Sequence, residues 1–144
     1  MKISPAIPII RIFSEDKAKE FYLDFLGFKL DWEHRFEANF PLYVQVSRSG
    51  LTLHLSEHHG DATPGSTVFV RMEDIDVLHR ELTAKNYAYA KPAIQDLPWG
   101  RVWKWRTRLG TGFGFVRRRV NSALAGQILA RMHENPGKDS QISL

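Results

Sequence analysis

Hydrophobic and polar positions in residues 6–32 follow a strand pattern, then a helix pattern, then a strand pattern again. Residues 6–13 are a short apolar run rich in β-branched side chains, which is typical of a strand. Ser14 can cap a helix over residues 15–26, and Gly27 can end that helix in the left-handed conformation. The apolar side chains of this helix recur with helical spacing and predict one buried stripe: Ala18, Phe21, Tyr22, Phe25 and Leu26.

The same pattern returns 60 positions later, which indicates an internal duplication. Residues 66–72 form a second candidate strand, Asp74 stands where Ser14 stands in the first copy, and Asn86 can end the second helix. The apolar stripe of this helix consists of Ile75, Leu78 and Leu82. A short chain with two such copies is predicted to fold as two similar modules that enclose a cleft.

Further strands are predicted after the first helix, over residues 28–34, 43–48 and 51–57. Ser49 and Gly50 fit a tight hairpin turn between the last two strands. Alternation along the last strand separates an apolar face from a polar face that can line a cleft. The apolar face carries Leu51, Leu53 and Leu55, and the polar face carries Thr52, His54 and Ser56.

The second copy continues in the same way, with strands predicted over residues 87–91, 101–106 and 113–118 and a loop over residues 92–100. The predicted fold class is therefore α+β, with two βαβββ modules that form a curved mixed sheet and carry their helices on its outer face. We expect a single domain over residues 1–119, with modules over residues 1–60 and 65–119, followed by an irregular basic tail.

Composition narrows the functional classes. The chain has 144 residues, is 43% hydrophobic and contains no cysteine, so a real core is expected and disulfides are excluded. It shows no signal peptide and no long apolar run, which predicts a cytoplasmic protein with no membrane role. The net charge of +4 comes from residues 103–144, where eight Lys and Arg face two Asp and Glu.

This basic segment places three arginines, at positions 117–119, near Trp103 and Trp105. Basic and aromatic residues together can bind nucleic acid. However, no nucleic-acid motif accompanies them, and we interpret the segment as a solvated extension and expect no nucleic-acid partner.

Residues 18–28, with the sequence AKEFYLDFLGF, resemble the first helix and second strand of the vicinal oxygen chelate superfamily, which contains the glyoxalases and the bleomycin-resistance proteins. Pro98, Trp99 and Gly100 add a loop typical of the bleomycin-resistance proteins, so the resemblance covers residues 5–102. The resemblance implies a homodimer with ligand clefts at the subunit interface, often with the first strand exchanged between subunits.

The resemblance ends after Val102, where relatives continue with a strand and an Asp-Pro-x-Gly-Asn turn. A reading frame shifted by one base permits such a sequence from this point. We therefore hypothesise that residues 103–144 arose by a frameshift, which predicts irregular structure over residues 120–144.

Members of this superfamily that hold a metal take one His, Gln or Glu from each of the first, fourth, fifth and eighth strands. Here the first strand offers Pro8 and Ile10, the fifth offers Thr67, Phe69 and Arg71, and the eighth offers no such donor. The fourth strand offers His54 and Glu57, which alternate to opposite faces. One or two ligands do not make a catalytic metal site, so we expect no metal and no cofactor. No motif for nucleophilic catalysis is present either.

The remaining signal is a set of aromatic and polar side chains around the predicted cleft. Aromatic rings on loops can stack on planar heterocycles and on cations. The candidate ligand-binding residues are Trp32, Phe36, Phe40, Tyr43, Gln45, His54, Trp99 and Arg101. Alternation places Trp32 with Phe28 and Leu30, so a core position is equally consistent for that residue.

Acidic residues lie near these positions in sequence, namely Asp31, Glu33, Glu37 and Asp96. They favour a cationic planar ligand, and the resemblance implies an antibiotic of the bleomycin type that is bound and sequestered without reaction. The alternative is a metalloenzyme of the glyoxalase or thiol-transferase type that uses His54, Glu57 and a third ligand. A third possibility is an inactive product whose eighth strand does not form.

Overall fold

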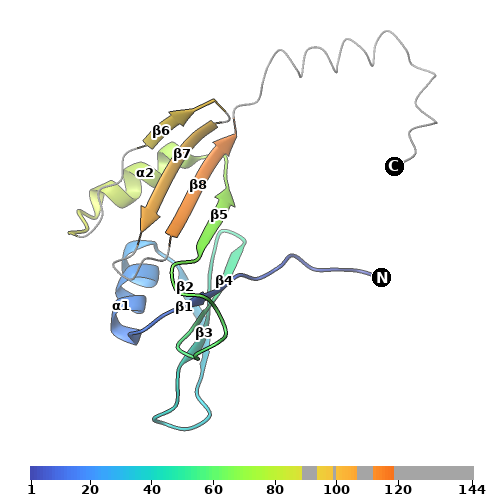
Figure 1. Cartoon of the computed structure of the whole chain (residues 1–144). Coiled ribbons are helices and arrows are strands. Elements are labelled where there is room, and N and C mark those ends of the chain that lie inside the picture. Colours follow the sequence, from blue (N-terminus) through green and yellow to red (C-terminus); the bar gives the residue numbers. More distant parts are fainter. Residues whose placement is uncertain (89–93, 99, 107–111, 119–144) are drawn as a thin grey trace.

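The computed structural model describes residues 1–88, 94–98, 100–106 and 112–118. These residues form two four-stranded mixed sheets, in the orders β1-β4-β3-β2 and β5-β8-β7-β6 (Figure 1). The first module consists of β1 (Ile9–Arg11), α1 (Glu15–Lys19), the π-helical η1 (Glu20–Phe25), β2 (Lys29–His34), β3 (Tyr43–Arg48) and β4 (Leu51–Ser56). The second consists of β5 (Thr67–Arg71), α2 (Ile75–Ala84), β6 (Ile94–Leu97), β7 (Gly100–Arg106) and β8 (Gly112–Arg118). The predicted α+β class with two βαβββ modules is confirmed.

The duplication extends to the pairing of the strands. β1 runs parallel to β4 with Ile9 opposite His54, and β5 runs parallel to β8 with Phe69 opposite Gly114. Both pairs are separated by the 60 positions that also separate the two helix caps. The two modules therefore have the same internal register.

The first helix forms as predicted and has an irregular second half. The Ser14 side chain accepts a hydrogen bond from the Lys17 amide (3.4 Å), and Gly27 follows the helix with φ +70°. Asn86 ends α2 in the same left-handed region, with φ +48°. The predicted stripes are buried in both helices.

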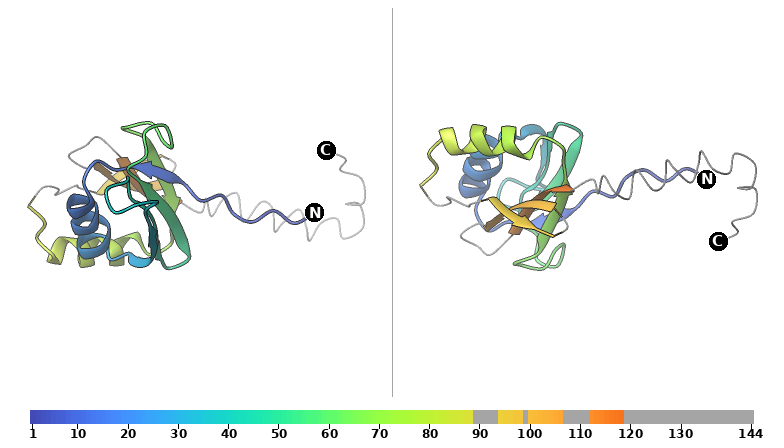
Figure 2. Two further views of the ribbon diagram at one scale, coloured as in Figure 1. Left: turned by 90° about the horizontal axis from the view of Figure 1, so that it is seen from below. Right: turned by 90° about the horizontal axis from the view of Figure 1, so that it is seen from above.

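The two helices lie next to each other and join the modules through one core (Figure 2). The rings of Phe25 and Tyr87 stack with their centroids 4.4 Å apart. The Lys85 ammonium donates to the main-chain oxygens of Asp24 and Phe25, both at 2.8 Å. Trp103 is 1% exposed and belongs to the same core.

The structure corrects three expectations. β6 occupies residues inside the predicted loop 92–100, whereas residues 87 and 88 are not part of a strand. Ser56, expected on the polar face, is fully buried. The rest of the predicted strand 87–91 lies outside the described residues.

Residues after Val102 take part in the fold. They supply most of β7 and all of β8, which pairs with both β5 and β7, so the eighth strand does form. The predicted tail over residues 120–144 lies outside the described part of the chain. Within the described part, no helix is long and apolar enough to cross a membrane.

Candidate functional site

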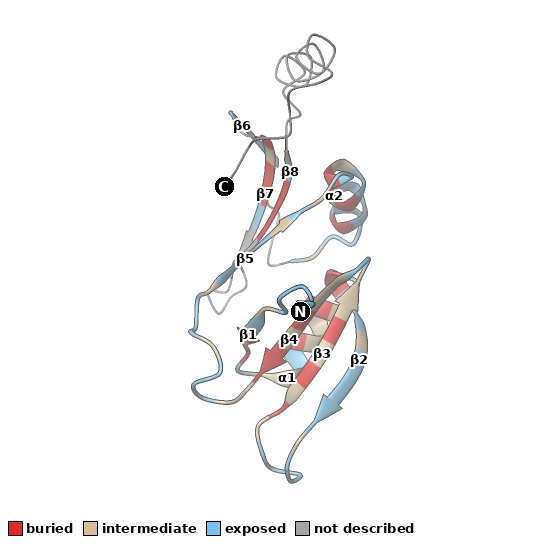
Figure 3. Ribbon diagram, turned by 90° about the vertical axis from the view of Figure 1, so that its right-hand side faces the viewer, coloured by how far each residue is buried: buried red, intermediate tan, exposed pale blue. Residues whose placement is uncertain are grey.

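One face of the first sheet is covered by the helix and the other is open (Figure 3). Along β3 and β4 the buried residues Val44, Val46, Leu53 and Leu55 alternate with less buried ones, as the colours of Figure 3 show. Cross-strand pairing places Ile9, His54, Gln45 and Trp32 in one row across all four strands. The first strand thus presents Ile9 to this face, and Ile10, expected there, is fully buried.

A β-bulge in β2 decides the position of Trp32. The pairing with β3 shifts between Leu30, which is opposite Val46, and Trp32, which is opposite Gln45. Asp31 is the extra residue, and such an insertion reverses the alternation that follows it. Trp32 is consequently 43% exposed on the open face and is not a core residue.

Aromatic rings gather around this row. The rings of Trp32 and Tyr43 are stacked, with centroids 6.0 Å apart and planes at 13°. The His54 ring meets both of them edge-on, at 5.4 and 5.3 Å. Farther along the same edge, Phe36 contacts the rings of His34 and His58 at 5.0 and 6.1 Å. We call Trp32, Phe36, Tyr43 and His54 the ring cluster.

Hydrogen bonds connect the polar members of the row. The Tyr43 hydroxyl lies 2.8 Å from His54 Nδ1, and His54 Nε2 lies 3.0 Å from Gln45 Oε1. Gln45 Nε2 donates to Asp31 Oδ2 at 3.0 Å, and Ser47 Oγ donates to Asp31 Oδ1 at 2.9 Å. The bonds from Gln45 and Ser47 hold the pKa of Asp31 below its usual range. We call Tyr43, His54, Gln45, Asp31 and Ser47 the hydrogen-bond chain.

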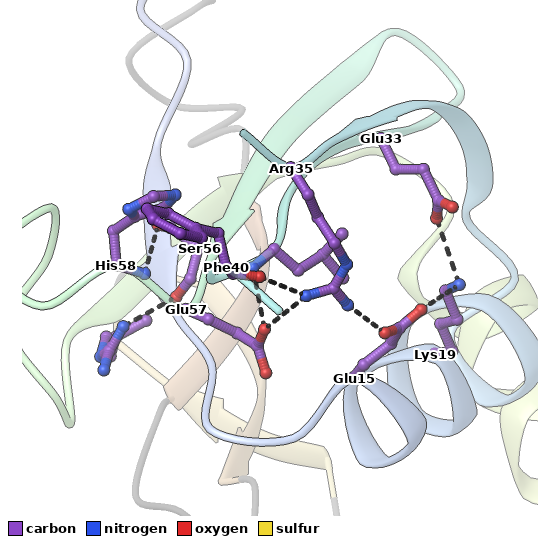
Figure 4. Close-up of polar contacts among 10 residues, drawn as sticks. Glu15, Lys19, Glu33, Arg35, Phe40, Ser56, Glu57 and His58 are labelled. Carbon is purple, nitrogen blue, oxygen red and sulfur yellow. Dashed lines mark hydrogen bonds and ion pairs between the residues drawn. The ribbon is translucent and has the colours of Figure 1, made fainter. Parts of the chain in front are cut away.

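Arg35 anchors the loop that carries Phe36 and Phe40 (Figure 4). Its guanidinium pairs with Glu15 at the start of α1 and donates to the main-chain oxygen of Phe40 at 2.7 Å. It also lies 3.5 Å from Glu57. Phe36 and Phe40 are 72% and 45% exposed, so both rings reach solvent from an anchored loop.

Ser56 anchors a second loop beside Tyr43. Its buried hydroxyl donates to Asp61 at 2.6 Å and accepts from the His58 amide at 3.0 Å. Partial burial, with a smaller effect of the Asp61 carboxylate, raises the pKa of Tyr43 and keeps its hydroxyl protonated at neutral pH.

Two predicted site residues are not part of this group. Arg101 lies in the second sheet and pairs with Asp76 of α2 at 2.7 Å and with Asp96 at 3.3 Å. Trp99 lies outside the described residues. The structure thus brings Trp32, Phe36, Tyr43, Gln45 and His54 together, with Phe40 in the adjoining loop.

A separate crevice of about 600 Å³ lies between the modules. Its walls include Phe28, Leu51, Met72, Val77 and Phe115, together with the ion pair between Arg48 and Glu81. No local pattern predicts this crevice, because its walls come from segments that are distant in sequence.

Comparison with known proteins identifies the family. The sequence profile of glyoxalase superfamily proteins matches residues 1–121. The chain belongs to the glyoxalase superfamily. No match was found among curated proteins.

Several solved structures share the fold of this chain. TnmS3, an antibiotic-binding protein from Streptomyces sp. CB03234, is 23% identical, with a TM-score of 0.63 over 82% of this chain and 98% of its own. The bleomycin-binding protein of Streptomyces verticillus, complexed with copper(II)-bleomycin, is 25% identical, with a TM-score of 0.61 over 81% and 98%. A bleomycin-binding protein complexed with bleomycin is 19% identical, with a TM-score of 0.61 over 81% and 100%.

The described part of this glyoxalase superfamily chain was compared with the needs of a metal site. Among the residues that the structure describes, no three His, Asp or Glu side chains lie close enough together to share an ion. Both ring nitrogens of His54 lie in the hydrogen-bond chain. Glu57 accepts from the Leu42 amide at 2.8 Å and faces Arg35. The open face therefore offers stacked rings and hydrogen-bonding side chains.

Proposed function

We propose that this protein binds a planar small molecule on the ring cluster and acts by sequestration, with an antibiotic of the bleomycin type as the leading candidate. The observation that carries the proposal is the stacked, solvent-facing pair of Trp32 and Tyr43 with the His54 edge beside it. Stacking on exposed aromatic rings suits planar heterocycles. Antibiotic-binding proteins among the structural neighbours support the same class of ligand.

Charge supports a cationic ligand. Asp31 lies at one end of the ring cluster, and a second carboxylate, that of Asp61, bonds Ser56, which is paired with Tyr43 across β3 and β4. Complementary charge increases the association rate and disfavours anionic competitors.

We further propose that the protein acts as a cytoplasmic homodimer. The edge strands β1 and β5 expose Ile9 and Phe69, and the neighbouring Ile7 and Phe13 are exposed as well. A second copy would shelter these side chains and supply another wall for the ring cluster. Sedimentation equilibrium at micromolar concentration tests this, and a mass of one chain would contradict it.

Calorimetric titration with metal-free bleomycin tests the binding site. We expect saturation with one ligand per site, and Trp32→Ala should weaken binding by about fivefold or more, because stacking on one ring contributes about 1 kcal/mol or more. Val77→Ala is the matched control, since Val77 is exposed on α2 beside the crevice. Equal affinities of the wild type and Trp32→Ala would refute the site.

Recovery of the ligand distinguishes sequestration from catalysis. After incubation with the protein and added Ni²⁺, Mn²⁺ or Zn²⁺, mass spectrometry should return bleomycin unchanged and in stoichiometric amount. Turnover to a product that depends on His54 and Glu57 would favour the metalloenzyme of the glyoxalase or thiol-transferase type instead.

A further inference from the structure

The hydrogen-bond chain ends on a group that can only accept. Both carboxylate oxygens of Asp31 are occupied, one by Gln45 Nε2 and the other by Ser47 Oγ. An ionised carboxylate has no proton to give. The lowered pKa of Asp31 keeps it ionised at neutral pH. Asp31 therefore fixes the direction of every bond that follows it.

The direction can be traced from residue to residue. The Gln45 amide must turn its NH₂ group to Asp31, because the opposite orientation would bring two oxygens together. Its oxygen then faces His54 Nε2 at 3.0 Å, so the proton of the neutral imidazole lies on Nε2. His54 Nδ1 is left as an acceptor, and the Tyr43 hydroxyl donates to it at 2.8 Å.

We propose that Asp31 acts as a positioning residue that sets the donor and acceptor polarity of the site. With the Tyr43 proton directed at His54, the Tyr43 oxygen turns only lone pairs toward a ligand stacked on Trp32. The site therefore selects planar heterocycles that carry an N–H donor at the ring edge and disfavours those that present only acceptors. The selectivity rests on the proposed function, whereas the tautomer of His54 does not.

The bulge makes this arrangement possible. Asp31 is the extra residue of β2, and the bulge leaves its carboxylate and the Trp32 ring together on the face that carries Gln45 and Ser47. In a regular strand, neighbouring residues such as Asp31 and Trp32 would point to opposite faces. One irregularity thus supplies both the stacking ring and the group that orients the hydrogen bonds.

Long-range ¹H–¹⁵N NMR of the full chain without ligand, at a pH where imidazole is neutral, tests the tautomer. We expect the Nε2–H form of His54 in the wild type and in the control Glu33→Gln, which removes a charge on the same strand. In Asp31→Asn the new amide can donate to Gln45 and reverse the chain, so the Nδ1–H form should appear. The double variant Asp31→Asn with Gln45→Glu moves the carboxylate one link along and should restore Nε2–H. A wild type with Nδ1–H, or an Asp31→Asn spectrum identical to the wild type, would overturn the proposal.

A pair of probes tests the selectivity. 2-Aminobenzothiazole and 2-(dimethylamino)benzothiazole share one ring system, and only the first carries N–H donors. By calorimetry the wild type should bind the first about tenfold more tightly, the usual effect of one hydrogen bond in a binding site. The preference should shrink in Asp31→Asn and return in the double variant. Equal affinities of the wild type for the two probes would overturn the selectivity. If neither probe binds, both the selectivity and the proposed function are overturned. The NMR test of the role of Asp31 does not depend on either result.

Discussion

Gly27 stands at a position where the backbone and a neighbouring side chain both exclude other residues. It ends the first helical segment with φ +70°. A Cβ atom added there would lie 2.9 Å from Nη1 of Arg48. That guanidinium is not free to move, because it donates to the main-chain oxygen of Leu26 and to Glu81 at 2.6 Å. We therefore predict that Gly27→Ala destabilises the protein in two independent ways, through the strained backbone of residue 27 and through displacement of the Arg48 guanidinium.

The size of the effect follows from these contacts. A left-handed backbone costs a residue with a Cβ about 1 kcal/mol. Displacing Arg48 weakens one bond to a main-chain oxygen, about 1 kcal/mol, and a partly exposed ion pair, a few tenths of a kcal/mol. We expect Gly27→Ala to reduce the free energy of unfolding by about 2 kcal/mol, and the melting temperature by about 8 °C for a domain of this size.

Chemical denaturation monitored by circular dichroism measures this change, and Gly50→Ala is the matched control. Gly50 has φ +84° in the β3–β4 turn, and an added Cβ would meet no atom within 4 Å. Its substitution should cost only the backbone term, about 1 kcal/mol. In an Arg48→Met background the excess cost of Gly27→Ala should disappear. Equal costs at both glycines, or an excess that persists without the guanidinium, would refute the reasoning.

Further predictions concern the polar anchors. Ser56→Ala should reduce the free energy of unfolding by about 1–2 kcal/mol, because the buried hydroxyl bonds both Asp61 and the His58 amide. Ser56→Thr is the control that keeps the hydroxyl, and chemical denaturation compares the unfolding free energies of the two variants. The hydrogen bond from Lys19 lowers the pKa of Glu15 below 4.5, so ionised Glu15 stabilises the fold above that pH, and this stabilisation is lost as the pH falls through the lowered pKa. Glu15→Gln should therefore flatten the acid side of a plot of unfolding free energy against pH. An unchanged slope would contradict this. The hydrogen bond to Glu15 raises the pKa of Lys19 above 10.5, so charged Lys19 stabilises the fold below that pH, and this stabilisation is lost as the pH rises through the raised pKa. Lys19→Met should remove this loss of stability on the alkaline side of the same plot.

Much of the fold could be predicted because its signals are local. A cap, a stripe and a stop residue lie within 14 consecutive positions at Ser14 to Gly27, and each acts through the backbone of its own neighbourhood. Repetition of this pattern at Asp74 and Asn86 then gave the second module. Asp74 stands at the N-cap of α2, as predicted, but its side chain makes no capping hydrogen bond. Its position in the sequence therefore marked the start of the helix although the expected bond is not formed.

The open face of the first sheet was harder to predict. Alternation alone places Trp32 on the same face of β2 as Leu30, whereas the bulge at Asp31 puts it on the opposite face. A bulge arises from pairing between two strands, and no residue type in β2 marks it. Ser56 was assigned to the polar face by the same alternation, yet it is fully buried and its hydroxyl bonds Asp61 in the loop that follows β4. In both cases alternation alone was insufficient, because the side chain's position depends on contacts between segments that are separate in sequence.

Arg101 and β6 show a second reason why the site could not be predicted fully from the sequence. Arg101 follows the predicted loop in sequence and was expected to reach the ligand, but two carboxylates, Asp76 and Asp96, hold its guanidinium. Asp96 lies in β6, directly opposite Arg101 in the pairing of β6 with β7. The partner of a charged side chain is set by strand register, which the loop-like composition of residues 92–100 concealed.

The duplicated register also separates the roles of the two modules. At equivalent positions the first module pairs Ile9 with His54, and the second pairs Phe69 with Gly114. The first pair therefore offers an imidazole that is linked through Gln45 to Asp31, whereas the second offers a bare glycine beside a ring that is 58% exposed. Gly114 is not required sterically, since a Cβ there would meet Phe69 at an ordinary 3.7 Å. At this position the first sheet thus carries a side chain that can form directed hydrogen bonds, whereas the second sheet carries an exposed phenyl ring beside a buried glycine.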